Sequence, residues 1–152
     1  MQAIIVYYSL TGQTAQAAKY IAKGLEAENV DVVISLNAHK ATADDLRNKD
    51  IVVIGTPVHV GAPAMELRRF LNKLPEDALS GKKVAIFSTF LFWGSDTALN
   101  TVEEILRDKG ASGDILRMAR RTSILRNIWN ALTGSTKDEE AWIAFGKLIA
   151  TS

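Results

Sequence analysis

Apolar runs of strand length alternate with segments of helical periodicity along most of the chain. Five short apolar runs have the continuous character of strands that are buried on both faces of a sheet: 3–8, 30–36, 51–55, 83–88 and 114–118. The segments between and after them place apolar residues on one helical face, at 14–28, 64–74, 97–109 and 138–149, with a short helix or loop at 43–48. The least regular region is 113–137, where 123–132 is a candidate for an additional helix.

This alternation of strand and helix predicts an α/β fold in three layers, a five-stranded parallel sheet with helices on both faces. Right-handed crossovers between parallel strands leave few topologies to consider. The chain shows no internal repeat, low-complexity tract or linker, so we expect residues 1–152 to form a single domain.

Composition narrows the chemistry that the fold can carry. The chain has no cysteine, which excludes disulfides, thiolate metal sites and cysteine nucleophiles. Its only histidines, His39 and His59, are too few for a histidine-built metal centre, and we expect no metal site. The N-terminus lacks a basic leader followed by an apolar core, and no apolar run reaches the roughly 20 residues that span a bilayer, so we expect a cytoplasmic location.

The charge is nearly balanced overall but uneven along the chain. The net charge is +1, whereas the stretch 107–126 carries six basic residues against two acidic ones, a net +4. Such a stretch is a candidate for a surface that faces a partner or a membrane. The near-neutral total and the lack of a recognisable motif argue against nucleic acid as a partner.

The loop after the first predicted strand is rich in hydroxyl groups. In "YYSLTGQT", residues 7–14, Ser9, Thr11 and Thr14 surround Gly12 just where a helix begins. Ligands of parallel α/β sheets lie beyond the carboxyl ends of the strands, and a helix N-terminus attracts anions. Because the loop contains no lysine or arginine, its neutral donors suit a monophosphate ester better than a triphosphate with its metal. The plainer alternative is a turn with a Ser or Thr N-cap.

Three segments together resemble the flavodoxin-like family. They are "SLTGQT" at 9–14, "IVVIGTPVHVGAPAMELRRFLNKL" at 51–74 and "VAIFSTFLFWG" at 84–94, which are similar to the phosphate loop and the two flavin-binding loops of that family. The likeness covers most of 3–110, with the segments in the right order. It implies FMN bound without a covalent link, redox chemistry, and a sheet of order 2-1-3-4-5.

The resemblance also implies which residues hold the flavin. Those expected at the phosphate are Ser9, Thr11, Gly12 and Thr14, with Leu10 and Gln13 contributing backbone N–H groups. Those expected beside the ring are Thr56, Pro57, Val58, His59, Gly61, Thr89 and Trp93. Trp93 is a candidate for stacking on the ring and His59 for a hydrogen bond to its pyrimidine end, whereas Phe90 and Phe92 fit the core better. For His59 the alternative is an ordinary exposed loop histidine, and backbone groups of Thr56, Val58, Gly61 and Thr89 are equally plausible contacts with the ring.

Three functions remain open from the sequence. The first is an electron carrier whose redox partners dock near the flavin edge, since no catalytic acid, base or nucleophile stands out. The second is a small FMN-dependent oxidoreductase, because "SILRNIWNALTGSTKDEEAWIAFGKLI" at 123–149 loosely resembles the tail of menaquinone-dependent protoporphyrinogen oxidases. In that case the basic, amphipathic segment 117–132 is a candidate for peripheral membrane or quinone contact, the alternative being that its apolar face packs on the fold. The third is a module of this fold that binds no flavin.

Overall fold

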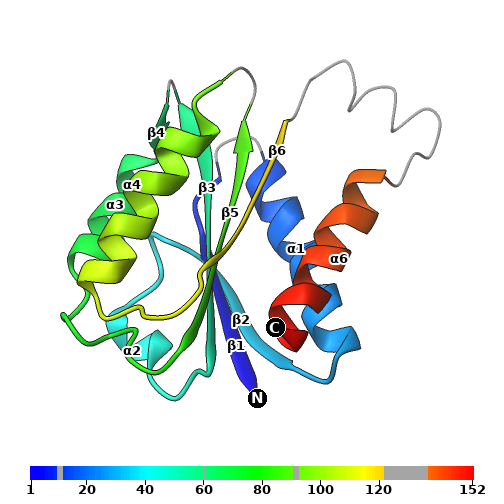
Figure 1. The fold of residues 1–152 in the computed structure, drawn as a ribbon, viewed down its shortest axis with the longest axis horizontal. Helices are drawn as coiled ribbons and strands as arrows, with labels where there is room; N and C mark the ends of the chain where they lie inside the picture. The colour runs from blue at the N-terminus through cyan, green and yellow to red at the C-terminus, as the bar shows by residue number, and fades with distance from the viewer. Residues whose placement is uncertain (10–11, 60, 91–92, 122–136) are drawn as a thin grey trace.

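The computed structural model describes residues 1–9, 12–59, 61–90, 93–121 and 137–152. A parallel sheet lies between two layers of helices (Figure 1). Its strands, in spatial order, are β2 (Asp31–Asn37), β1 (Gln2–Tyr7), β3 (Ile51–His59), β5 (Lys83–Phe90) and β6 (Leu116–Arg121). All four neighbouring pairs run parallel. The predicted fold class and strand order 2-1-3-4-5 are therefore confirmed, with one addition described next.

The addition is β4 (Ala62–Pro63), a two-residue strand that pairs antiparallel with the end of β3. β3 itself is longer than the predicted 51–55, and the last strand lies two to three residues beyond the predicted 114–118. Val58 pairs with Pro63 and His59 with Ala62, so the chain folds back on itself directly after the sheet. This tight return positions the loop that the sequence assigned to the flavin.

Helices cover both faces of the sheet (Figure 1). α1 (Gln13–Ala27) and α6 (Lys137–Thr151) pack on one face, and α3 (Met65–Asn72) and α4 (Ser95–Asp108) on the other, with the single turn α2 (Ala43–Leu46) after β2. The candidate helix at 123–132 lies outside the described residues. No helix of the described chain is long and apolar enough to cross a membrane.

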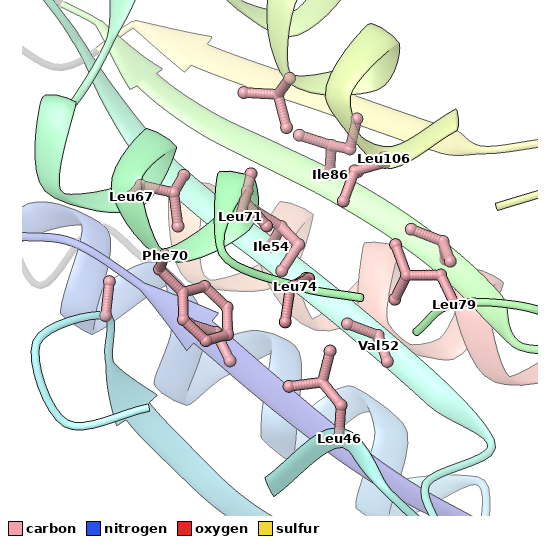
Figure 2. Packing of buried hydrophobic residues seen from close by; sticks show 14 of the residues in the cluster. Leu46, Val52, Ile54, Leu67, Phe70, Leu71, Leu74, Leu79, Ile86 and Leu106 are labelled. Carbon is pink, nitrogen blue, oxygen red and sulfur yellow. The ribbon is translucent and has the colours of Figure 1, made fainter. Parts of the chain in front are cut away.

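The α3 and α4 side contains the larger core. Because side chains alternate along a strand, Val52 and Ile54 of β3 point to this face, where Leu67 and Leu71 of α3 meet them (Figure 2). All four side chains are fully buried. This packing anchors the body of α3, so that its N-terminus is held at the carboxyl edge of β3.

The α1 and α6 side is packed more closely, backbone against backbone. A methyl group on Gly24 of α1 would overlap the Ile143 carbonyl of α6, and one on Gly146 would overlap the Ile21 carbonyl. The two glycines thus allow the helices to cross at short distance. On the same face, Phe87 of β5 packs edge-on against Trp142 of α6, with ring centroids 5.6 Å apart.

Candidate functional site

The candidate site lies at the carboxyl edge of β1, β3 and β5, where the three loops singled out in the sequence meet. Each loop contains a glycine with positive φ: Gly12 (85°) before α1, Gly61 (77°) between β3 and β4, and Gly94 (90°) before α4. Residues with a side chain seldom adopt this conformation, so the backbone path favours glycine at these turns.

Among the described residues, no side chain caps the start of α1. Gly12 occupies the N-cap position, where it offers no capping side chain, and the first turn carries no acidic residue. The Gly12 N–H donates to Ser9 Oγ at 3.0 Å, which fixes the turn before the helix. A methyl group on Gly12 would have no described atom within 4 Å. The helix therefore presents uncapped N–H groups and the positive end of its dipole beside open space.

A buried pair of hydroxyls joins the first loop to the third. Thr14, in the first turn of α1, lies 2.9 Å from Thr89 near the end of β5, measured between their Oγ1 atoms. The residues are only 1% and 5% exposed. The Thr89 hydroxyl is thus directed to the residue expected at the phosphate, and the expected contact of Thr89 with the ring stays a prediction.

Thr56 holds the turn between β3 and α3. Its Oγ1 donates to the Pro57 carbonyl at 2.9 Å and accepts from the Ala64 N–H at 2.9 Å, and the residue is fully buried. The Thr56 hydroxyl is thus committed to the protein itself. Any contact of this turn with a ligand is left to its backbone and to the half-buried Pro57 and Val58.

The second and third loops lie close together at their glycines. A Cβ built on Gly61 would lie 3.9 Å from the Gly94 Cα. Gly94 was not among the predicted site residues, although a glycine between Trp93 and a helix was a signal that could have identified it. Trp93 is 69% exposed beside this contact, an exposure that suits stacking on a flat ligand.

The remaining predicted residues divide into two groups. Gln13 is the first residue of α1, so its N–H belongs to the uncapped helix end. Leu10 and Thr11 lie outside the described residues, as does the side chain of His59, and their predicted roles stay predictions. Within the described chain there is no group of three or more residues of the types that bind metal ions.

Comparison with known proteins decides the family. A family model for the flavodoxin domain matches residues 4–122. The chain belongs to the flavodoxin domain family. Among its relatives, the flavodoxin of Clostridium beijerinckii is 34% identical over 108 residues, 70% of this chain and 76% of the relative. The flavodoxin of Megasphaera elsdenii is 32% identical over 111 residues, 71% of this chain and 78% of the relative.

Solved flavodoxin structures share the fold. Two-electron reduced Megasphaera elsdenii flavodoxin superposes with a TM-score of 0.74 at 24% identity, over 99% of both chains. A flavodoxin from the domain Archaea superposes with a TM-score of 0.75 at 23% identity, over 99% of this chain and 96% of the other. The family membership confirms the predicted cofactor and activity: this flavodoxin-like protein binds FMN and transfers electrons.

The residues present fit FMN on the structure's own terms. FMN carries one terminal phosphate. The uncapped start of α1 and the Thr14 hydroxyl provide neutral donors for such a group, and no described atom lies within 4 Å of a Cβ built on Gly12, which leaves room for it. When bound, the flavin supplies the electron-accepting and electron-donating chemistry, and the protein supplies position and exposure.

Proposed function

We propose that this flavodoxin-like chain is a single-domain electron carrier that holds the FMN phosphate at the start of α1 and the flavin ring beside the loops after β3 and β5. The observation that supports this most strongly is the uncapped end of α1 under open space at Gly12. An anion there gains hydrogen bonds from the first N–H groups and the favourable end of the helix dipole.

Each part of the phosphate site has a separate task. Ser9 accepts from the Gly12 N–H and keeps its own proton for an anion, since a hydroxyl both donates and accepts. Gln13 offers its backbone N–H group, and Thr14 offers its hydroxyl. Thr11 and Leu10 are proposed to complete the loop.

The ring is proposed to lie beside Trp93 and the glycine contact. Pro57, Val58 and Gly61 supply its other boundary, with the His59 side chain at the pyrimidine end. A redox partner would dock over this edge, where Trp93 and the 60% exposed Met65 of α3 present apolar surface. In amide spectra titrated with a redox partner, we expect shifts at Gly61, Met65 and Trp93; shifts confined to α6 would contradict this location.

A matched pair of glycine variants tests the phosphate site. Gly12 and Gly81 both have positive φ, and neither has a described atom within 4 Å of a built Cβ, but Gly81 precedes β5 at the opposite edge of the sheet. Gly12→Ala and Gly81→Ala therefore cost similar backbone strain, about 1–2 kcal/mol. Only Gly12→Ala places a methyl group in the space assigned to the phosphate.

We expect Gly12→Ala to weaken FMN binding at least tenfold in a fluorescence titration and Gly81→Ala to leave it unchanged. The wild-type protein should carry FMN that is released on denaturation and bleaches with dithionite. Equal FMN affinity in the two variants would contradict the phosphate site. A colourless protein that ignores added FMN in calorimetry would contradict the function itself.

The second candidate is an FMN-dependent oxidoreductase of the quinone-linked type. A relative named NAD(P)H dehydrogenase (quinone), from Syntrophobacter fumaroxidans, is 26% identical over 117 residues, covering 59% of this chain and 57% of the relative. Steady-state oxidation of NADH by menadione separates the two functions: catalytic turnover supports the oxidoreductase, and its absence in an FMN-loaded sample supports the carrier.

The basic segment offers limited support for membrane or quinone contact. In its described part, Arg117 pairs with Glu103 at 3.0 Å and Arg120 with Asp138 at 2.8 Å, so these charges are balanced within the fold. A contact through 117–132 would rest on its residues beyond 121, which lie outside the described chain. Sedimentation with anionic liposomes at low and high salt tests it, because surface electrostatic binding weakens with salt.

A further inference from the structure

The bond between Thr14 and Thr89 links two segments that are 75 residues apart. Thr14 belongs to the helix start assigned to the phosphate, and Thr89 precedes the last residue of β5, whose loop is assigned to the ring. Both side chains are withdrawn from solvent, at 1% and 5% exposure, so water does not compete for the bond. The pair is therefore a fixed connection between the two halves of the proposed FMN site.

The direction of this bond is set by what Thr14 does with its proton. In the protein alone, either hydroxyl can be the donor. Each hydroxyl has one proton and two lone pairs. If Thr14 gives its proton to an anion at the start of α1, it can bond to Thr89 only as the acceptor. Thr89 must then be the donor, and the two bonds run in series from Thr89 to Thr14 to the anion, each polarising the other.

We propose that Thr89 is a positioning residue for the FMN phosphate, donating to Thr14 Oγ1 so that the Thr14 proton is directed to the phosphate. This inference rests on the proposed function. It assigns the Thr89 hydroxyl to the phosphate subsite through Thr14, while the contact of the Thr89 backbone with the ring stays a prediction. It also couples the phosphate loop to the end of β5.

The geometry favours this role over direct contact with the ring. The single Thr89 proton is engaged once Thr89 donates to Thr14, so the hydroxyl has no proton left for a polar atom of the ring. Its neighbours in the ladder, Pro57 and Arg120, hold it on both sides within the sheet. If Thr89 contacted the ring, its substitution would weaken the binding of every flavin. If Thr89 acts on the phosphate, its substitution weakens only the binding of phosphorylated flavins.

The test compares FMN with riboflavin, which has the same ring and no phosphate. Dissociation constants are measured by flavin fluorescence on apoprotein for the wild type, Thr89→Val, Thr89→Ser and Thr101→Val. Thr101 is a matched control, a threonine of α4 whose hydroxyl donates to the Thr97 carbonyl. We expect Thr89→Val to weaken FMN roughly five- to tenfold, the range for one lost hydrogen bond. Riboflavin binding should not change, Thr89→Ser should restore FMN affinity, and Thr101→Val should alter neither ligand.

A double-mutant cycle provides an independent readout. Because Thr89 acts through Thr14, the double variant Thr14→Val/Thr89→Val should bind FMN no more weakly than Thr14→Val alone. Additive losses, or an equal loss of FMN and riboflavin affinity in Thr89→Val, would overturn the inference while leaving the FMN site intact. A wild-type protein that binds neither flavin would instead overturn the proposed function, so the two failures are distinguishable.

Discussion

At the residue scale, buried hydroxyls divide into those with partners and one without. Thr56 makes two hydrogen bonds and Thr14 pairs with Thr89, whereas Ser88 Oγ has no partner in the described structure. Ser88 pairs with Thr56 in the β3–β5 register, so both side chains share one face of the sheet. A buried polar group without a partner costs stability, while one with partners contributes to it.

This contrast predicts opposite effects for two small substitutions. Ser88→Ala removes an unsatisfied hydroxyl, so the free energy of unfolding should stay equal or rise by up to about 1 kcal/mol. Thr56→Val leaves the Ala64 N–H without its acceptor and should lower it by about 1–3 kcal/mol. Urea unfolding of the apoproteins measures both. A Ser88→Ala variant less stable than Thr56→Val would contradict this account.

Residue patterns could predict the features of the candidate site that are local in sequence, but not those that depend on contacts between distant segments. The hydroxyl loop at 9–14 is local in sequence, so its position before a helix could be read directly. The Thr14–Thr89 bond spans 75 residues and depends on how α1 packs on β5, which no local pattern encodes. The contact of Gly61 with Gly94 likewise arises only when the two loops meet.

At the element scale, apolar periodicity predicted the order of strands and helices because burial of a continuous face determines both. It missed β4 and the far end of β3, since that stretch includes Gly55 and Pro57, which disfavour regular strands. Its pairing depends on the antiparallel return of Val58 against Pro63, a tertiary feature. The close crossing of α1 and α6 was also not visible in the periodicity, although Gly24 and Gly146 make it possible.

The close crossing of α1 and α6 predicts that Gly146→Ala lowers stability, although alanine has the higher helix propensity. Gly146→Ala should favour the isolated helix by about 1 kcal/mol, but its methyl group overlaps the Ile21 carbonyl and must push α6 away from α1. Overpacking of this kind costs about 1–3 kcal/mol, so we expect a net loss of stability in urea unfolding. Lys147→Ala, at the exposed neighbouring position, is the control and should be nearly neutral. A stabilised Gly146→Ala would show that the helices do not pack backbone to backbone.

At the scale of the whole molecule, ion pairs balance part of the positive charge that the sequence concentrates in 107–126. Glu103 of α4 pairs with both Arg107 and Arg117, at 3.1 and 3.0 Å, and Asp138 of α6 pairs with Arg120. Both acidic partners lie outside 107–126, so the net charge of that segment overstated the charge available to a partner protein or membrane. Within the described residues, the start of α1 has neither a capping side chain nor an acidic residue in its first turn, and it lies where three loops converge.

The most direct test of the central claim is an amide chemical-shift titration of the ¹⁵N-labelled apoprotein with FMN and, separately, with riboflavin. If the phosphate lies at the start of α1, the N–H signals of Gln13 and Thr14 should move strongly with FMN and little with riboflavin, because hydrogen bonding to a charged oxygen deshields the amide proton. Signals beside the ring, at Gly61 and Gly94, should move with both ligands. Equal movement of the Gln13 and Thr14 amides with FMN and riboflavin would contradict the account.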